Sequence, residues 1–189
     1  MTGDMRLSLD GFYLDIKILY GFGRVRSMRD EVDGLIDAWE RQRTDLDLTP
    51  MSVFSRISRL AHHLDKARRA AFTTHHLEAW EWDVLAALRR AGDPFELSPG
   101  RLLRETLVTS GTMTNRVDRL VGRGLVERHP DPNDRRGVLV RLTPEGMDAV
   151  DGAFAALLEA ERDLLTGLSD PDRVALAGLL RQLLAPFAG

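Results

Sequence analysis

Residues 98–143 constrain the fold of this chain more than any other segment. Two short helical stretches, over about 98–105 and 109–122, precede two stretches of alternating apolar and polar residues, Leu125–Arg128 and Val138–Leu142. The alternation predicts a pair of strands joined by a loop. This order of elements is typical of a winged helix-turn-helix, whose second helix enters the major groove of duplex DNA.

The positive charge of the chain is concentrated in the same segment. Residues 98–143 contain nine Arg and five Asp or Glu, a net charge of +4, whereas the whole chain of 189 residues carries −3. The remainder therefore carries −7. A positive field confined to the element that would meet phosphates favours double-stranded DNA as the partner.

The composition excludes several other classes of protein. The chain contains no Cys, so it has neither disulfides nor a thiol nucleophile. No apolar run reaches about 18 residues, and the apolar residues 12–20 are interrupted by Asp15 and Lys17. We therefore expect a cytoplasmic protein with no membrane partner and no cofactor.

The whole chain is predicted to be mainly α with a small β-hairpin wing, in four parts. Residues 1–27 do not match the rest, and we expect an N-terminal extension that is disordered or not translated; the alternative is a genuine mobile arm. Residues 28–48 form an extra N-terminal helix. Residues 49–76 and 144–189 form a helical dimerisation region around a DNA-binding domain, residues 77–143.

Helical periodicity and capping signals give the expected bounds of the helices outside the DNA-binding unit. We expect helices over about 29–43, 50–72 with Thr49 as N-cap, and 77–91, then one of about 20 residues from Thr143-Pro144-Glu145, and one from Ser169-Asp170-Pro171 to about Leu184. The last two carry more apolar surface than two helices can hide, which indicates a homodimer interface. The alternative is an ordinary intrachain core.

The start of the predicted recognition helix is rich in small and hydroxyl residues. Such residues let the helix N-terminus approach base edges and phosphates closely. Arg119 can reach bases or phosphates, and Arg101 on the preceding helix, which Ser98 caps, can reach the backbone. We predict base or phosphate contacts from Ser110, Gly111, Thr112, Thr114 and Asn115, above a core face of Val117, Leu120 and Val121. The alternative for each Arg taken singly is a solvated surface charge.

The loop Asp131–Gly137 is predicted to be the wing. Arg135 and Arg136 at its tip suit insertion into a narrow, electronegative minor groove. Asp134 would repel phosphate, so its expected role is to hold a neighbouring Arg by a bidentate salt bridge.

Over about Met51–Leu184 the sequence resembles the MarR family of transcriptional regulators. The resemblance is carried by Leu97-Ser-Pro-Gly-Arg-Leu102, Thr109-Ser-Gly-Thr-Met-Thr-Asn-Arg-Val-Asp-Arg-Leu120, Gly124-Leu-Val-Glu-Arg128, Asp131-Pro-Asn-Asp-Arg-Arg136 and Leu142-Thr-Pro-Glu-Gly146. It implies a homodimer that presents two recognition helices and two wings to a pseudo-palindromic operator, and a ligand-responsive regulator, usually a repressor.

A narrower resemblance is to the urate-responsive PecS/HucR subgroup, through the extra helix, Arg59-Leu-Ala-His-His-Leu64 and Trp80-Glu-Trp-Asp-Val-Leu85. By matching motifs, this resemblance implies an effector site for urate or a related purine such as xanthine. Its residues would be Trp39, His63, Asp83, Arg116 and Arg128.

The chemistry of these side chains suits urate, a planar monoanion. Trp39 offers an aromatic face, and Arg116 offers a fork-shaped cationic donor. Without ligand, Asp83 is expected to pair with Arg116, and an anion would compete for that Arg. Trp39 as a dimer anchor and a purely structural Asp83–Arg116 pair are the alternatives, as are a phenolic acid effector and an architectural DNA-binding factor with no ligand.

Neither a metal site nor catalysis is expected. The adjacent pairs His62-His63 and His75-His76 point about 100° apart on a helix, so neither pair chelates by itself. An enzyme using Asp83 and His63 as acid and base lacks any supporting motif, and we predict no catalytic residues.

Overall fold

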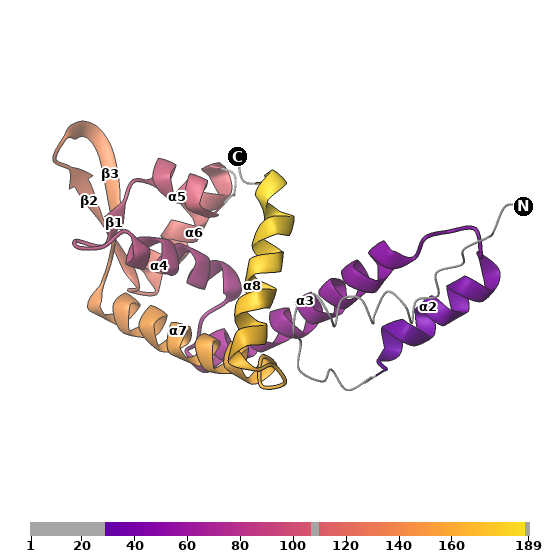
Figure 1. Cartoon of the computed structure of the whole chain (residues 1–189). Coiled ribbons are helices and arrows are strands. Elements are labelled where there is room, and N and C mark those ends of the chain that lie inside the picture. The colour runs from indigo at the N-terminus through magenta and orange to yellow at the C-terminus, as the bar shows by residue number, and fades with distance from the viewer. Residues whose placement is uncertain (1–28, 107–109, 188–189) are drawn as a thin grey trace, which may run out of the picture. The chain divides into compact units, whose positions relative to one another are not determined.

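The structure is a computed structural model that describes residues 29–106 and 110–187 (Figure 1). The predicted extension over residues 1–27 lies outside the described residues. In chain order the elements are α2 (Glu31–Gln42), α3 (Thr49–Thr74), α4 (Ala79–Arg90), β1 (Glu96–Leu97), α5 (Pro99–Thr106), α6 (Ser110–Gly122), β2 (Val126–Asp131), β3 (Asp134–Leu142), α7 (Pro144–Leu164), α8 (Asp170–Leu184) and the 3-10 helix η1 (Ala185–Phe187).

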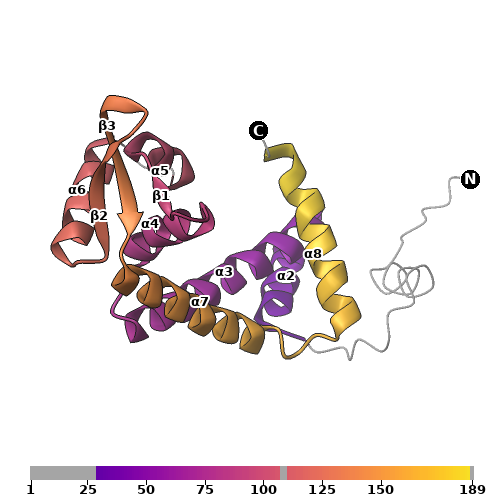
Figure 2. The same ribbon diagram turned by 90° about the vertical axis from the view of Figure 1, so that its left-hand side faces the viewer.

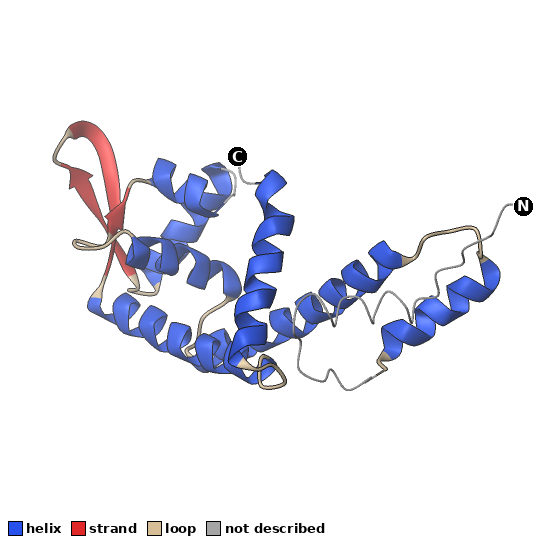
Figure 3. Cartoon of the chain, viewed as in Figure 1, coloured by secondary structure: helices blue, strands red, loops and turns tan. Residues whose placement is uncertain are grey.

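Helices predominate, and the strands form one small antiparallel sheet (Figure 3). This confirms the predicted fold class, mainly α with a β-hairpin wing. The helix bounds also agree closely with the sequence pattern. One cap differs: Thr49 is the first residue of α3 rather than its cap, and its backbone N–H donates to the Asp47 carboxylate at 2.9 Å.

The sheet is larger than the sequence pattern predicts. The strand order is β1-β3-β2, and the short β1 was not predicted because two residues show no alternation. β1 pairs with β3, and the Glu96 carboxylate accepts from Arg141 Nε at 2.8 Å across that pair. The hairpin is also longer than expected, since β2 runs to Asp131 and β3 begins at Asp134.

The chain divides into two compact units, residues 1–58 and 59–189, and α3 runs through the boundary. In the first unit, the Asp30 side chain caps α2 by accepting from the backbone N–H groups of Val32 and Asp33 at 2.9 and 3.1 Å. Arg56 of α3 donates to both Asp30 and Asp33 at 2.8 Å. These bonds lower the Asp30 pKa to about 2, with Arg56 as the main cause, and they join α2 to the first half of α3.

The core of the second unit lies under the helix-turn-helix and the sheet. Apolar side chains of α4, α5 and α6 meet those of the strands, as the ridge spacing of amphipathic helices requires. Figure 2 shows the hairpin beside α6 and α5. The side chains that are less than 2% exposed include Val84, Leu85, Leu88, Leu102, Met113, Val117, Leu120 and Val140.

α7 is fixed to the wing domain at its first turn. Thr143 caps the helix, and its hydroxyl accepts from the Gly146 backbone N–H at 3.0 Å and donates to the Gly124 carbonyl at 2.7 Å. Gly146 packs so tightly that a Cβ there would lie 2.0 Å from the Leu125 carbonyl oxygen. The glycine of the Leu-Thr-Pro-Glu-Gly motif is therefore a packing requirement.

The last helix has an unusual surface. α8 begins where the sequence pattern predicts, with Ser169 as its N-cap, but it contains no buried residue. Its apolar side chains are exposed, together with several of α7: Phe154, Leu158, Val174, Leu179, Leu183, Leu184 and Phe187 of η1. Large exposed apolar groups of this kind mark an interaction surface. Within residues 29–106 and 110–187, no helix is both long and apolar enough to cross a membrane.

Substitution of Gly146 tests the junction between the wing and α7. Gly146→Ala forces the new methyl group against backbone, so we expect it to lower the free energy of unfolding by at least about 2 kcal/mol. Gly100→Ala is the matched control, because a Cβ at Gly100 meets nothing within 4 Å. Urea denaturation of both variants measures the effect, and equal stability of the two would contradict the packing argument.

Candidate nucleic-acid interface and effector pocket

The N-terminal half of α6 presents the predicted base-reading residues to solvent. Gly111, Thr112, Thr114 and Asn115 are all exposed, while Met113 and Val117 on the same helix are buried. Met113, Val117 and Leu120 recur at helical spacing and form the inner face. Val121 was predicted to be core but is 38% exposed, because it lies about 100° around the helix from Leu120. The Ser110 side chain lies outside the described residues.

α5, the first helix of the helix-turn-helix, begins as predicted at Ser98. Its hydroxyl accepts from the Arg101 backbone N–H at 3.4 Å, and Arg101 is exposed. A backbone phosphate contact by Arg101 stays a prediction.

The wing is a tight hairpin rather than a long loop. Only Pro132 and Asn133 lie between the strands, and the Asn133 backbone N–H donates to the Asp131 carboxylate at 2.8 Å. A Cβ at Gly137 would lie 2.8 Å from that of Asp131, so the hairpin needs glycine there. Asp134 is exposed at the start of β3. The side chains of Arg135 and Arg136 lie outside the described residues, so the predicted roles of the wing residues are untested.

A hollow of about 470 Å³ lies beside the base-reading face of α6. Its lining combines predicted DNA contacts with Arg116 and an aromatic residue from α4: Trp80, Gly111, Thr112, Asn115, Arg116 and Arg119. Trp80 was predicted to be core or interface; it is half-buried and packs against the core, and it also lines this hollow.

Two further ion pairs brace α6 from behind. Arg128 of β2 lies 2.6 Å from the Asp118 carboxylate, which ties the helix to the sheet. Arg123 donates to Glu81 of α4, a carboxylate that is 1% exposed, and to the His76 carbonyl at 2.8 Å. Neither pair was predicted, since ion pairs between distant segments leave no local sequence signal.

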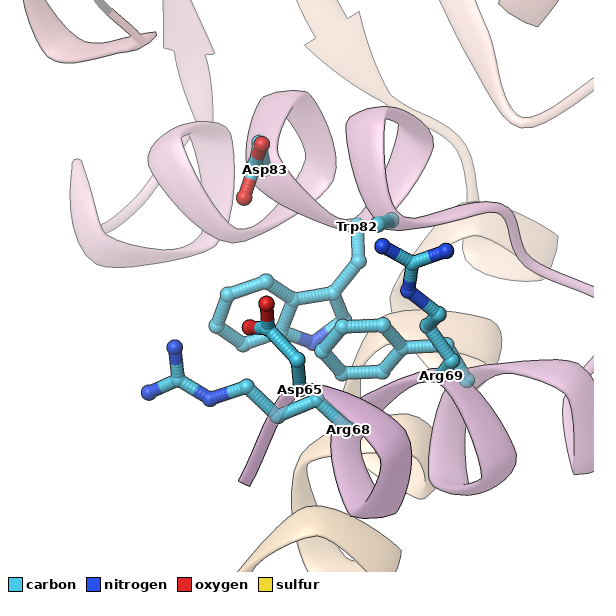
Figure 4. A pocket seen from close by; sticks show the side chains of 7 residues that line it. Asp65, Arg68, Arg69, Trp82 and Asp83 are labelled. Carbon is cyan, nitrogen blue, oxygen red and sulfur yellow. The ribbon is translucent and has the colours of Figure 1, made fainter. Parts of the chain in front are cut away.

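A second, smaller cavity of about 190 Å³ lies between α3 and α4 (Figure 4). Its lining holds both charges and an aromatic stack: Asp65, Arg68, Arg69, Phe72, Ala79, Trp82 and Asp83. The rings of Phe72 and Trp82 are parallel to within 12° at 4.8 Å. The Trp82 indole N–H is buried and has no hydrogen-bond partner in the described part of the chain. Arg68 and Arg69 were not predicted.

Asp83 is the one predicted effector residue that lines this cavity. Burial raises the pKa of its carboxyl group, and the nearby positive charges of Arg116, Arg68 and Arg90 oppose that rise. A desolvated carboxylate in a field of guanidinium groups responds strongly to any ion that enters.

Of the other predicted effector residues, Arg116, His63 and Arg128 do not line this cavity. The expected ion pair between Asp83 and Arg116 is absent from the described residues, and Arg116 instead lies over the Trp80 ring, 5.6 Å from its centroid, with Nη1 buried and unpartnered. The Trp80 ring, rather than the Asp83 carboxylate, is therefore the group that Arg116 contacts. His63 is exposed and contacts the His62 ring edge-on, with the ring centroids 5.9 Å apart. Trp39 belongs to the first unit and is 50% exposed.

The side chains of the described segments form no group of three or more potential metal ligands. The fold and the exposed face of α6 instead define a winged helix-turn-helix DNA-binding protein. A family model described as the MarR family matches residues 76–137. The chain is 36% identical to the HTH-type transcriptional regulator PecS of Dickeya dadantii, over 79% of this chain and 90% of that one.

Two solved structures agree with this relationship. A mutant of Escherichia coli MarR in complex with operator DNA is 28% identical, with a TM-score of 0.56 over 74% of this chain and 99% of that chain. Bordetella bronchiseptica BpsR is 30% identical, with a TM-score of 0.52 over 68% and 98%. The chain belongs to the MarR family of transcriptional regulators, and it is a DNA-binding regulator rather than an enzyme.

Removal of the wing charges tests the predicted minor-groove contact. The double variant Arg135→Ala, Arg136→Ala should weaken operator binding by about 100-fold and flatten the dependence of affinity on salt, because fewer counterions are released. Fluorescence polarisation over a salt series measures both effects.

The matched control removes the same charge from helices outside the DNA-binding domain, as Arg41→Ala with Arg162→Ala. If both double variants keep the affinity and salt slope of the parent protein, the wing does not contact DNA.

Proposed function

We propose that this protein is a repressor that leaves its operator when a small aromatic anion binds, with urate or a related purine such as xanthine as the favoured effector. The carrying observation is the α3–α4 cavity, which places Asp83 beside two guanidinium groups and a stacked aromatic pair. Operator DNA lies in the cytoplasm, so the protein would act there.

The cavity has the chemistry that a planar anion requires. Arg68 and Arg69 offer forked donors, and the Trp82 indole N–H offers a third donor that has no acceptor in the described structure. A volume of about 150 Å³ is enough for benzene in an apolar cavity. The 190 Å³ here therefore suits a small aromatic molecule.

The predicted residues divide between binding the effector and transmitting its effect. Asp83 lies at the cavity, and its carboxyl pKa is influenced by the charge of Arg116 on the recognition helix. An anion beside Asp83 would add negative charge to this field and attract Arg116. Such a ligand lowers DNA affinity only if it binds better to the conformation that cannot bind DNA. We propose Trp39, His63 and Arg128 as further members of the site, on the resemblance alone.

A phenolic or other hydroxylated aromatic acid is the second candidate effector. In BpsR, 6-hydroxynicotinic acid regulates DNA binding. That acid, like urate, is a planar anion, so the same cavity chemistry applies. A third candidate, an architectural DNA-binding factor with no ligand, would leave the cavity without a function.

The protein is further proposed to act as a homodimer on a pseudo-palindromic operator. The exposed apolar faces of α7 and α8 support this, because they have no partner within the described part of the chain. Two recognition helices would then read half-sites about 10 base pairs apart.

Sedimentation velocity tests the dimer. We expect one species of twice the chain mass at micromolar concentration, and Leu179→Glu with Leu183→Glu should convert it to monomer, because charges replace exposed apolar groups of α8. The control Arg162→Glu reverses the charge at an exposed, polar position of α7 and should leave the dimer intact. A monomeric parent protein would exclude the proposed dimer.

A gel shift on the DNA upstream of the protein's own reading frame tests the effector. Urate, xanthine, salicylate and 6-hydroxynicotinate are titrated side by side, and urate should release the DNA at the lowest concentration. Trp39→Phe and Arg69→Ala should each raise the urate concentration needed for half-release by about tenfold, which corresponds to about 1.4 kcal/mol.

The outcomes separate the parts of this proposal. Arg162→Ala on α7 is the matched control for Arg69→Ala and should leave the urate response unchanged. An intact response in Trp39→Phe removes Trp39 from the site, and an intact response in Arg69→Ala removes the cavity. Release by salicylate or 6-hydroxynicotinate but not by purines would establish the second candidate.

A further inference from the structure

Trp80 lies beneath the two arginines of the recognition helix. The guanidinium carbon of Arg119 is 4.5 Å from the centroid of the Trp80 ring, and that of Arg116 is 5.6 Å away. Both distances are within the range of cation–π attraction, which is strongest for tryptophan. The indole N–H of Trp80 donates to Glu78 Oε2 at 2.6 Å, which fixes the ring.

The Glu78 carboxylate also pairs with Arg119. Arg119 Nη2 donates to Glu78 Oε1 at 3.1 Å, so Glu78 holds the aromatic ring with one oxygen and the guanidinium group with the other. The side chains of Glu78 and Arg119 are 60% and 55% exposed. Ion pairs as exposed as this one are weak and exchange readily with other anions.

This cluster adjoins the surface that would face DNA. Trp80 and Arg119 line the hollow beside α6 together with Gly111, Thr112 and Asn115, which are predicted to approach the bases. A phosphate oxygen that reaches this hollow meets Arg119 at the edge that Glu78 now occupies. Phosphate and carboxylate both form forked, charge-assisted bonds with guanidinium, so a DNA phosphate can take the place of this exposed carboxylate.

We propose that Glu78 and Trp80 form a clamp that positions Arg119 for DNA. Trp80 holds the guanidinium plane, and Glu78 occupies the place of a DNA phosphate until the operator replaces it. Both are positioning residues, because they act through Arg119. The inference rests on the proposed function in one respect only, that α6 reads DNA.

The two residues therefore have opposite effects on affinity. Loss of the Trp80 ring frees the long Arg119 side chain, so ordering it on DNA costs more conformational entropy. Loss of the Glu78 charge removes a competitor of phosphate, so DNA binds more tightly. That gain is electrostatic and shrinks as salt rises.

The test measures affinity by fluorescence polarisation over a salt series. The probe is a duplex selected from a random-sequence pool by the wild-type protein. We expect Trp80→Ala to bind about tenfold more weakly, and Trp80→Phe to recover most of the loss. Glu78→Gln should bind about threefold more tightly at low salt, with a steeper salt dependence. Glu159→Gln removes the same charge from an exposed position of α7 and should bind like wild type.

A double-mutant cycle on Arg119 decides between positioning and a merely structural role. In an Arg119→Ala background, Glu78→Gln should have no further effect on affinity or salt slope, and the effect of Trp80→Ala should shrink to the part that its contact with Arg116 contributes. Undiminished effects there would overturn the clamp, as would Glu78→Gln that binds no more tightly than Glu159→Gln. Failure of the wild-type protein to select any duplex would instead overturn the proposed function.

Discussion

The ion pair between the buried carboxylate of Glu81 and the partly exposed guanidinium group of Arg123 is the interaction on which the DNA-reading unit depends. The Glu81 carboxylate accepts from Arg123, next to the end of α6, and from the Glu78 backbone N–H at 2.9 Å, at the start of α4. One carboxylate therefore caps α4 and joins it to the end of α6. A buried charge needs all its partners, and removal of either side chain would leave polar groups without hydrogen bonds. The position of α4 against α6 is therefore fixed by this ion pair as well as by apolar packing.

Ion pairs hold the recognition helix along its second half, and its first half carries the residues predicted to approach DNA. Asp118 pairs with Arg128 of β2, Arg119 with Glu78 at the N-cap of α4, and Arg123, just after α6, with Glu81 of α4. The exposed residues of the first turns, by contrast, are small or hydroxylated. Such an arrangement keeps the backbone of α6 rigid, so the small residues at its start can approach base edges without the entropy cost of ordering a loop.

The sequence pattern is sufficient for the helices, the hairpin and the family, because each depends on local periodicity, caps and short motifs. Helices begin at Thr143-Pro144-Glu145 and Ser169-Asp170-Pro171 as predicted, with Thr143 and Ser169 as their N-caps. Strand β1 was not predicted, because it has only two residues. Val121 was wrongly predicted to be core, because it lies at the edge of the buried face. The site was harder still. The cavity residues Arg68 and Arg69 lie on α3, and only the packing of α3 on α4 brings them to Asp83.

α4 is the element through which an effector would act on DNA binding. Successive residues of a helix point about 100° apart, so Trp80, Glu81 and Asp83 face three different neighbours: the hollow beside α6, the Arg123 side chain and the α3–α4 cavity. Because Glu81 couples α4 rigidly to α6, a ligand that displaced α4 at the cavity would displace α6 with it. A mobile loop between the two sites would absorb the same displacement. Under the proposed function, the Glu81–Arg123 ion pair therefore serves regulation as directly as it serves folding.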